Sequence, residues 1–302
     1  MSTERPSPRY SGIDVWDPSD ILDAIIEGQF AAVAAVRAVR PAIARAASAI
    51  EARLRDSGRL IYAGAGTSGR LAVQDGAELI PTFDWPPERL LLLMAGGQEA
   101  LLKSIEGAED EAEHAVRLVG KHNIHANDAV IAVAASGKTP FTLACLRESK
   151  QRGALTVGIA NNRGTPILEE ADHPIWLDTG SEPIAGSTRM NAGTSQRITL
   201  NLLSSLVMIL LGRVYEGLMV DLKAVNEKLV QRSENILMRL TSRSREDAQA
   251  ALKRADGSIK VAVLLLHGCD LDEATTALSR TGGQLRRALA LLGKPGSESG
   301  EG

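Results

Sequence analysis

The 302-residue chain has little of several residue types, and each scarcity narrows what the protein can be. It has only two cysteines, Cys145 and Cys269, which lie far apart in apolar segments and match no metal-binding or redox spacing. Both are expected to be reduced core residues. Lysines and arginines form no dense block and the net charge is only -3, so the basic surface of a nucleic-acid-binding protein is not expected.

Long apolar runs are lacking as well. The longest, "LLSSLVMILL" and "VAVLLLHG", fall short of the ~20 residues that span a bilayer, and "MSTERPSPRYSG" has no apolar core of a secretion signal. We therefore expect a cytoplasmic protein without membrane contact. The five histidines form no zinc-binding pair, so no metal site is expected. Small ligands are the expected partners.

Short apolar strands alternate with helical patterns in the first two thirds of the chain. Two helices are predicted within 20–55, with a break near Pro41. Because strands joined by helices of ten or more residues pair in parallel, the pattern predicts a three-layer α/β domain, whose ligands bind at the carboxyl ends of the strands. The predicted strands are 59–64, 89–96, 128–135, 155–161 and 173–178, and the predicted helices between and after them are 66–80, 98–120, 138–152 and 188–213.

After about residue 216 the strand signals stop. A long amphipathic helix is predicted from about residue 221, followed by short helices capped by Ser244, Ser258 and Asp270. We expect four parts: N-terminal helices over 1–55, the α/β domain over 56–216, a small all-helical domain over 217–292 and a disordered tail over 293–302.

The segment "IYAGAGTSGR" (61–70) has the G-x-G-x-x-G spacing of a nucleotide-binding loop. A dinucleotide site would need an acidic residue at the end of the second strand, but that strand ends in "MAGGQ". The loop instead places Thr67 and Ser68 between its glycines. Hydroxyls beside the free N–H groups of a helix N-terminus suit a compact phosphate.

Two later loops repeat this chemistry. "AASGKTP" (134–140) supplies Ser136 and Thr139, and "TGSEPIAGSTRMNAGTS" (179–195) supplies Ser187 and Thr188, each just before a predicted helix. Serine, threonine and glycine are also ordinary helix-cap residues, so any one loop alone would favour a structural role. Three such loops on one sheet favour a phosphate site.

These loops resemble those of the SIS (sugar isomerase) domain, a phosphosugar-binding fold. More narrowly, "IYAGAGTSGRLAVQDGAELIPTF", "SIEGAEDE", "AASGKTPFTLACL" and "GSEPIAGSTRMNAGTSQRITLNLLS", in that order, resemble the N-acetylmuramic acid 6-phosphate etherases. The resemblance covers about 55–290. It implies a SIS-type parallel sheet flanked by helices, and a lyase that cleaves the lactyl ether of its substrate and releases D-lactate and N-acetylglucosamine 6-phosphate without metal or cofactor.

Elimination of such an ether needs a base at C2 and an acid at the lactyl oxygen on C3, and two carboxyl groups suffice. The candidates are Glu78, expected to be partly buried, and Glu109. For Glu109 the alternative is a solvated acidic helix face shared with Glu106, Asp110 and Glu113. The resemblance implies that Glu78 acts as acid and base at the lactyl oxygen and water, and Glu109 as the C2 base, with Asp110 as a substitute candidate.

The resemblance also implies which residues hold the substrate. Arg70 and Arg189 would bind either a ligand or a carboxylate at the rim of the sheet. The third loop departs from the family pattern, because Ala185 and Asn191 stand where a hydroxyl residue and a lysine are usual. The implied binding residues are Gly66, Thr67, Ser68, Ser136, Gly137 and Thr139 around the phosphate, and Glu182, Ser187 and Thr188 in the sugar pocket.

Two other functions fit the same loops. An aldose-ketose isomerase of a related phosphosugar would need one glutamate, and a non-enzymatic phosphosugar-sensing regulator would need none. Lactate release separates both from an etherase. SIS domains commonly form homodimers, and the apolar segment "LNLLSSLVMILLG" (200–212) is either the dimer contact or the cover of the chain's own sheet.

Overall fold

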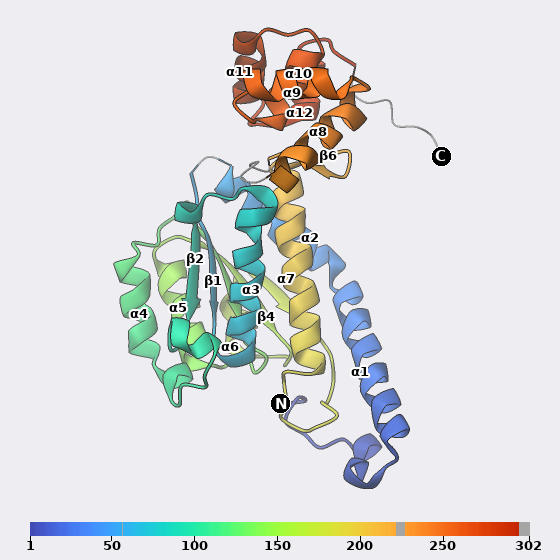
Figure 1. The fold of residues 1–302 in the computed structure, drawn as a ribbon. Coiled ribbons are helices and arrows are strands. Elements are labelled where there is room, and N and C mark those ends of the chain that lie inside the picture. Colours follow the sequence, from blue (N-terminus) through green and yellow to red (C-terminus); the bar gives the residue numbers. More distant parts are fainter. Residues whose placement is uncertain (56, 222–226, 296–302) are drawn as a thin grey trace. The chain divides into compact units, whose positions relative to one another are not determined.

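The computed structural model describes residues 1–55, 57–221 and 227–295 (Figure 1). Its contacts divide the chain into two compact units. The first consists of Met1–Ala77 and Pro87–Leu206, and the second of Glu78–Pro86 and Val207–Gly302.

A five-stranded parallel sheet forms the centre of the first unit, as predicted, with the strand order β2-β1-β3-β4-β5. Gly64 pairs with both Met94 and Val133, so the three neighbouring strands end at the same edge. The strand sequences are almost wholly apolar because helices cover both faces of the sheet. The strands are β1 (Leu60–Gly64), β2 (Leu90–Met94), β3 (Ala129–Val133), β4 (Leu155–Ala160) and β5 (His173–Trp176), at all five predicted places.

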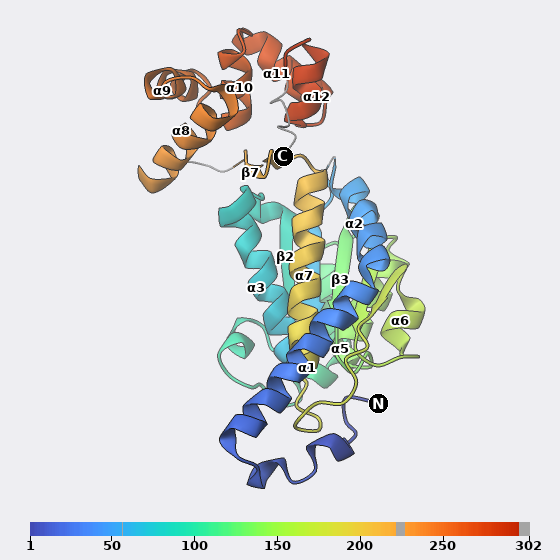
Figure 2. The same ribbon diagram turned by 90° about the vertical axis from the view of Figure 1, so that its right-hand side faces the viewer.

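The helices form the outer layers. Ile61 and Ala63 of β1 belong to a core cluster with residues of α4 and α5 on one face, whereas Tyr62 points to the opposite face, towards α3 and α7. Figure 2 shows α2, α3 and α7 in front of the strands. The helices of the unit are α1 (Pro18–Ala38), α2 (Arg40–Leu54), α3 (Gly66–Phe83), α4 (Ala112–Lys121), α5 (Pro140–Gln151), α6 (Pro166–Glu170) and α7 (Asn191–Leu210), with short 3-10 turns at Pro8–Tyr10, Ile13–Val15, Pro87–Arg89, Gln98–Leu101 and Ala108–Asp110.

Helix α1 leaves one apolar face uncovered. Its buried side is made of small residues, including Gly28, whereas four large apolar side chains on the other side are 48–70% exposed. Because they recur at spacings of four, four and three residues, they share one face of the helix. We call Leu22, Ile26, Phe30 and Val33 the α1 stripe. The predicted break near Pro41 is confirmed, since Val39 separates α1 from α2 and Pro41 lies in the first turn of α2.

The single helix predicted over 98–120 is wrong. Only 112–121 forms an α-helix, and 98–110 contains two 3-10 turns. Gly97 and Gly107 adopt φ values of +66° and +74°, which interrupt a right-handed helix. The Arg70 guanidinium also binds the carbonyls of Ala100 and Lys103, at 2.9 and 3.2 Å, in place of helical donors.

The second unit contains the small helical domain. Its capping boxes at Ser244 and Asp270 and the cap at Ser258 are confirmed. The helices are α8 (Glu227–Thr241), α9 (Arg245–Arg254), α10 (Ile259–Leu266), α11 (Leu271–Arg280) and α12 (Leu285–Leu291).

The second unit also contains a strand pair that the sequence did not predict. Strand structure does not stop at residue 216, because β6 (Val214–Tyr215) pairs with β7 (Leu218–Met219) in a small antiparallel hairpin. Residues 222–226, near the predicted start of the long helix, and 296–302 of the predicted tail lie outside the described residues. Both cysteines are buried, as predicted.

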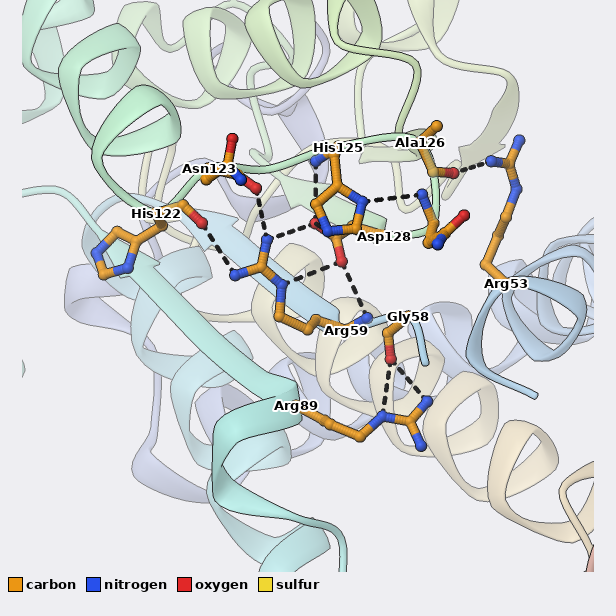
Figure 3. Close-up of polar contacts among 10 residues, drawn as sticks. Arg53, Gly58, Arg59, Arg89, His122, Asn123, His125, Ala126 and Asp128 are labelled. Atoms are coloured by element: carbon orange, nitrogen blue, oxygen red, sulfur yellow. Dashed lines mark hydrogen bonds and ion pairs between the residues drawn. The ribbon is translucent and has the colours of Figure 1, made fainter. Parts of the chain in front are cut away.

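At the amino ends of the strands, Arg59 lies at the centre of a hydrogen-bond network (Figure 3). Its guanidinium donates to the fully buried carboxylate of Asp128 at 2.6 and 3.1 Å and to the carbonyls of His122 and Asn123. Burial raises the pKa of Asp128, but hydrogen bonds from Arg59 and the His125 N–H outweigh it and hold that pKa below its ordinary value. These contacts therefore stabilise this end of the sheet.

Candidate functional site

The first loop joins β1 directly to α3 at the carboxyl edge of the sheet. Gly66 has a φ of +54°, with open space where a side chain would stand. A Cβ on Gly64 or on Gly69 would lie 2.8 Å from backbone atoms of the other glycine. Strand and helix therefore touch backbone to backbone, and the first N–H groups of α3 are presented at the edge, where an anion can bind.

The second loop follows β3 and leads into α5. Ser136 Oγ lies 3.2 Å from Thr139 Oγ1 and accepts a bond from the Lys138 N–H. Gly137 has a φ of +67°, and a Cβ there would lie 2.2 Å from Thr165 Oγ1, so only glycine fits. The two predicted hydroxyls thus face each other on a rigid turn.

The third loop precedes α7. The Gly193 N–H donates to the Thr188 carbonyl at 2.9 Å, and a Cβ on Gly193 would lie 3.7 Å from Thr67 Cγ2. The first and third loops therefore meet. Asn161, just after β4, joins the second and third: its N–H donates to the Ala135 carbonyl, and its side-chain amide donates to Ser195 Oγ of α7.

Glu182 is a buried residue of the third loop whose carboxylate binds backbone N–H groups. Its side chain is 1% exposed, and its two oxygens accept the N–H groups of Asn191 and Ala192 at 2.8 and 2.9 Å. Burial raises the pKa of Glu182, against the lowering effect of these two bonds. Glu182 thus caps the N-terminus of α7, and its contact with a sugar stays a prediction.

A cavity of about 340 Å³ opens beside the first loop. Gly66, Lys103 and Glu109 all lie on its wall, so the structure brings one predicted carboxylate to the glycine loop. Arg70 also lines the cavity. Its guanidinium donates to backbone carbonyls, and not to the ligand or carboxylate that we expected from the sequence. Sequence reasoning missed Lys103 and Glu106, because nothing in their polar run distinguishes them. The lining residues are Ala65, Gly66, Arg70, Met94, Ala95, Ala100, Lys103, Ser104, Ile105, Glu106, Gly107, Ala108 and Glu109.

Comparison with known proteins identifies the family. Residues 42–150 match the model of the glucokinase regulatory protein N-terminal SIS domain, and residues 99–206 match the SIS domain model. An N-acetylmuramic acid 6-phosphate etherase from Deinococcus radiodurans is 46% identical over 288 residues, which cover 95% of this chain and 94% of the relative. This chain belongs to the N-acetylmuramic acid 6-phosphate etherase family.

A second relative agrees. The N-acetylmuramic acid 6-phosphate etherase of Streptomyces coelicolor is 43% identical over 293 residues, 96% of this chain and 94% of its own. Among solved structures, a phosphoheptose isomerase from Francisella tularensis matches 65% of this chain and 98% of its own, at 20% identity and a TM-score of 0.48. The resemblance noted in the sequence, to the SIS domain and to the etherases, is confirmed.

The two carboxyl groups predicted for etherase chemistry lie on different elements, Glu78 on α3 and Glu109 on the 3-10 turn Ala108–Asp110. Glu109 is exposed on the cavity wall, in a 3-10 turn, and shares no continuous helix with Glu106 or Glu113. The expectation that Glu78 is partly buried is wrong: its neighbour Leu79 turns inward, and Glu78 itself is exposed. Glu78 is not among the residues that line the cavity.

Asn191, where the sequence departs from the expected pattern of the third loop, is not among the residues that line the cavity. Asn191 is 1% exposed, accepts a bond from Gln29 Nε2 at 3.1 Å, and packs over Gly28 so closely that a Cβ there would lie 2.6 Å from its oxygen. Thr194, one turn later, also bonds Gln29. Figure 2 shows α1 passing across α7.

Other expectations bear on partners. Of the described residues, no three His, Cys, Asp or Glu side chains group as a metal site, and no helix is apolar over enough length to cross a membrane. Leu200 and Leu203 of α7 have no exposed surface, whereas Leu202 is 46% exposed. This part of α7 therefore covers its own chain's core, and the dimer contact stays a prediction.

Proposed function

We propose that the protein cleaves the D-lactyl ether of N-acetylmuramic acid 6-phosphate, as a carbon–oxygen lyase of cytoplasmic cell-wall amino sugar recycling. A base removes the proton at C2 of the open-chain sugar, the C3–O bond breaks, and the lactyl oxygen is protonated. Water then adds at C3, which gives N-acetylglucosamine 6-phosphate and D-lactate. No metal or organic cofactor takes part. The observation that carries this proposal is the cavity shared by the glycine loop and Glu109, in a chain 46% identical to an etherase.

The phosphate is proposed to bind at the first two loops. Thr67 and Ser68 begin α3, where N–H groups and the helix dipole attract an anion, and Ser136 and Thr139 present two hydroxyls on one turn. Lys103, on the cavity wall, adds a positive charge beside the glycine loop. Ser187 and Thr188 complete the sugar pocket, because the third loop meets the first at Thr67.

Glu109 is proposed as the C2 base, since it lines the cavity beside the loop that would hold the phosphate. Glu78 is proposed as the acid at the lactyl oxygen and then the base for water. Glu78 is exposed on α3 and is not among the residues that line this cavity. We therefore propose a homodimer in which a second copy supplies Glu78.

The α1 stripe supports this homodimer. Four large apolar side chains on one helix face are 48–70% exposed, which is typical of a surface that is covered by a partner. The proposed division of the chain is the SIS domain over 56–216 between the N-terminal helices and the C-terminal helical domain. The stripe lies in the N-terminal helices, outside the loops that would hold the substrate.

The first experiment measures lactate released from N-acetylmuramic acid 6-phosphate by the purified protein, with Glu78→Ala and Glu109→Ala variants. Release by the wild type that is lost in both variants supports the etherase and its two carboxylates. Interconversion of a 6-phosphosugar without lactate would instead establish the isomerase, and tight binding without turnover the sensor.

The shared site has its own test, in which the two inactive variants are mixed, unfolded and refolded together. If Glu78 acts across the dimer, mixed dimers contain one site with both carboxylates and regain activity. If both carboxylates act within one chain, every site lacks one of them and the mixture stays inactive.

A further inference from the structure

Residues 2–4 lie against the carboxyl edge of the sheet, next to the second loop. Thr3 is a polar residue with no exposed surface. The Asn162 side-chain amide donates to Thr3 Oγ1 at 2.9 Å and to the Ala135 carbonyl at 2.8 Å, and its oxygen accepts from Ser2 Oγ at 3.2 Å. Asn162 thereby joins this segment to the residue that precedes Ser136.

The same segment holds the third loop. The Gly186 N–H donates to the Thr3 carbonyl at 3.0 Å, directly before Ser187 and Thr188. The Glu4 carboxylate covers the other side of this glycine, since a Cβ on Gly186 would lie 3.0 Å from Glu4 Oε2. Thr3 therefore links the third loop directly, through its carbonyl, and the second loop indirectly, through Asn162.

The third loop has hydrogen bonds of its own, from the Ser187 N–H to the Ile184 carbonyl and from the Gly193 N–H to the Thr188 carbonyl, both at 2.9 Å. Between β5 and α7 it contains no helix or strand, and Glu182 secures only its junction with α7. Gly186 has a φ of +78°, a conformation that glycine adopts easily and that does not itself fix the neighbouring residues. The bond from the Gly186 N–H to the Thr3 carbonyl, directly before Ser187, therefore ties this part of the third loop to residues 2–4.

We propose that Thr3 and Asn162 are positioning residues of the phosphosugar site. They hold Ser187 and Thr188 in register with the second loop, so residues 2–4 set the affinity for the 6-phosphosugar without touching it. The inference rests on the proposed function in one respect, that these loops bind the substrate.

Docking of the N-terminal helices is a separate matter. Helix α1 is attached to α7 by Gln29, which bonds both Asn191 and Thr194, and its buried Gly28 packs under Asn191. These contacts do not involve residues 2–4. Removal of the Thr3 bonds is therefore expected to change the loop while α1 stays in place.

The experiment compares Thr3→Val, Thr3→Ser and a chain without residues 2–4, with Arg5→Ala as the control, because Arg5 is exposed and lies two residues further along. Calorimetry measures the Kd of N-acetylglucosamine 6-phosphate, and lactate release gives KM and kcat. Thr3→Val keeps the shape but loses the hydroxyl, so Kd and KM should rise about three- to tenfold, the effect of one hydrogen bond. The shortened chain should show a larger rise, and Thr3→Ser should restore binding. kcat should not change, because no catalytic carboxylate is altered.

A Kd that is unchanged in both Thr3→Val and the shortened chain overturns the inference. A fall in kcat at constant KM, or an equal rise in Kd for Arg5→Ala, also overturns it. Loss of thermal stability without a change in Kd would show a purely structural segment. If the wild type releases no lactate while Kd still depends on Thr3, the etherase proposal fails and this inference stands.

Discussion

Gly64 and Gly69 touch backbone to backbone, and a Cβ on either would lie 2.8 Å from the other. This contact, at the junction of β1 and α3, sets how closely the first turn of α3 approaches the edge of the sheet. Neither glycine needs a positive φ, since both are absent from the residues in the left-handed region. Glycine is needed at both positions because the close contact leaves no room for a side chain.

Gly69→Ala should therefore move α3 away from β1. We expect a loss of stability of about 1–3 kcal/mol from overpacking and a raised KM, because the N–H groups that face the phosphate shift with the helix. Gly120→Ala is the matched control: it is the same change within helix α4, where the new Cβ meets only the end of the Arg152 side chain at 3.4 Å. The control should be stabilised slightly. Equal stability and KM in both variants would contradict the contact.

Ser68→Ala should weaken substrate binding. If the hydroxyl bonds the phosphate, its loss costs ~1.5–3 kcal/mol, and KM for N-acetylmuramic acid 6-phosphate rises about tenfold or more. Steady-state lactate release at varied substrate measures this, with Ser279→Ala in the C-terminal helical domain as control. An unchanged KM for Ser68→Ala would place the phosphate elsewhere.

Asp75 forms a buried network of the first unit. Its carboxylate accepts hydrogen bonds from Tyr62 Oη at 2.8 Å and from Ser204 Oγ at 3.2 Å, and the residue is 7% exposed. Asp75→Ala leaves the Tyr62 hydroxyl without this partner in the core, and should lower the free energy of unfolding by about 1–3 kcal/mol. Asp75→Asn keeps an acceptor and should be tolerated. Urea unfolding of the two variants at pH 7 makes the comparison, and equal losses would contradict it.

The pKa of Asp75 also predicts a pH dependence. Burial raises this pKa in the folded protein, against the lowering effect of its hydrogen bonds. The stability that it contributes is therefore fully present below the ordinary carboxyl pKa of about 3.9 and is lost as the pH rises through the raised value. The unfolding free energy of the wild type should fall relative to that of Asp75→Asn as the pH increases above about 4. A constant difference would contradict the shift.

Asp128 should show the opposite pH dependence. Because hydrogen bonds from Arg59 and the His125 N–H keep its pKa below the ordinary value despite burial, its stabilisation is present above about pH 4 and is lost as the pH falls further. Asp128→Asn should cost about 2–3 kcal/mol at pH 7, the effect of losing hydrogen bonds to a charge, and should remove this acid sensitivity.

The surface pair Arg147–Glu170 provides the control for Asp128. Both side chains are partly exposed, and their N–O distance is 2.6 Å. Glu170→Gln should cost less than about 1 kcal/mol, as exposed ion pairs do. A loss at Glu170 as large as that at Asp128 would show that burial does not distinguish them.

The sequence by itself determined the alternation of elements. Apolar strand segments can be buried on both faces only in a covered parallel sheet, so all five strands, the break before Pro41 and the capped C-terminal helices were predictable. The place of the three loops was predictable for the same reason, because glycines and hydroxyls that follow such strands necessarily lie at one edge. The etherase resemblance also came from contiguous motifs.

Only the tertiary structure decided what each polar side chain contacts. Arg70 was expected to bind a ligand or a carboxylate, yet it donates to the carbonyl of Ala100, thirty residues away, and Asn191 accepts a bond from Gln29 of α1. The failed helix at 98–110 has the same cause, since Arg70 binds its carbonyls across the fold. Local patterns fix which backbone shapes are favourable, whereas hydrogen bonds between distant segments are fixed only when packing brings them together.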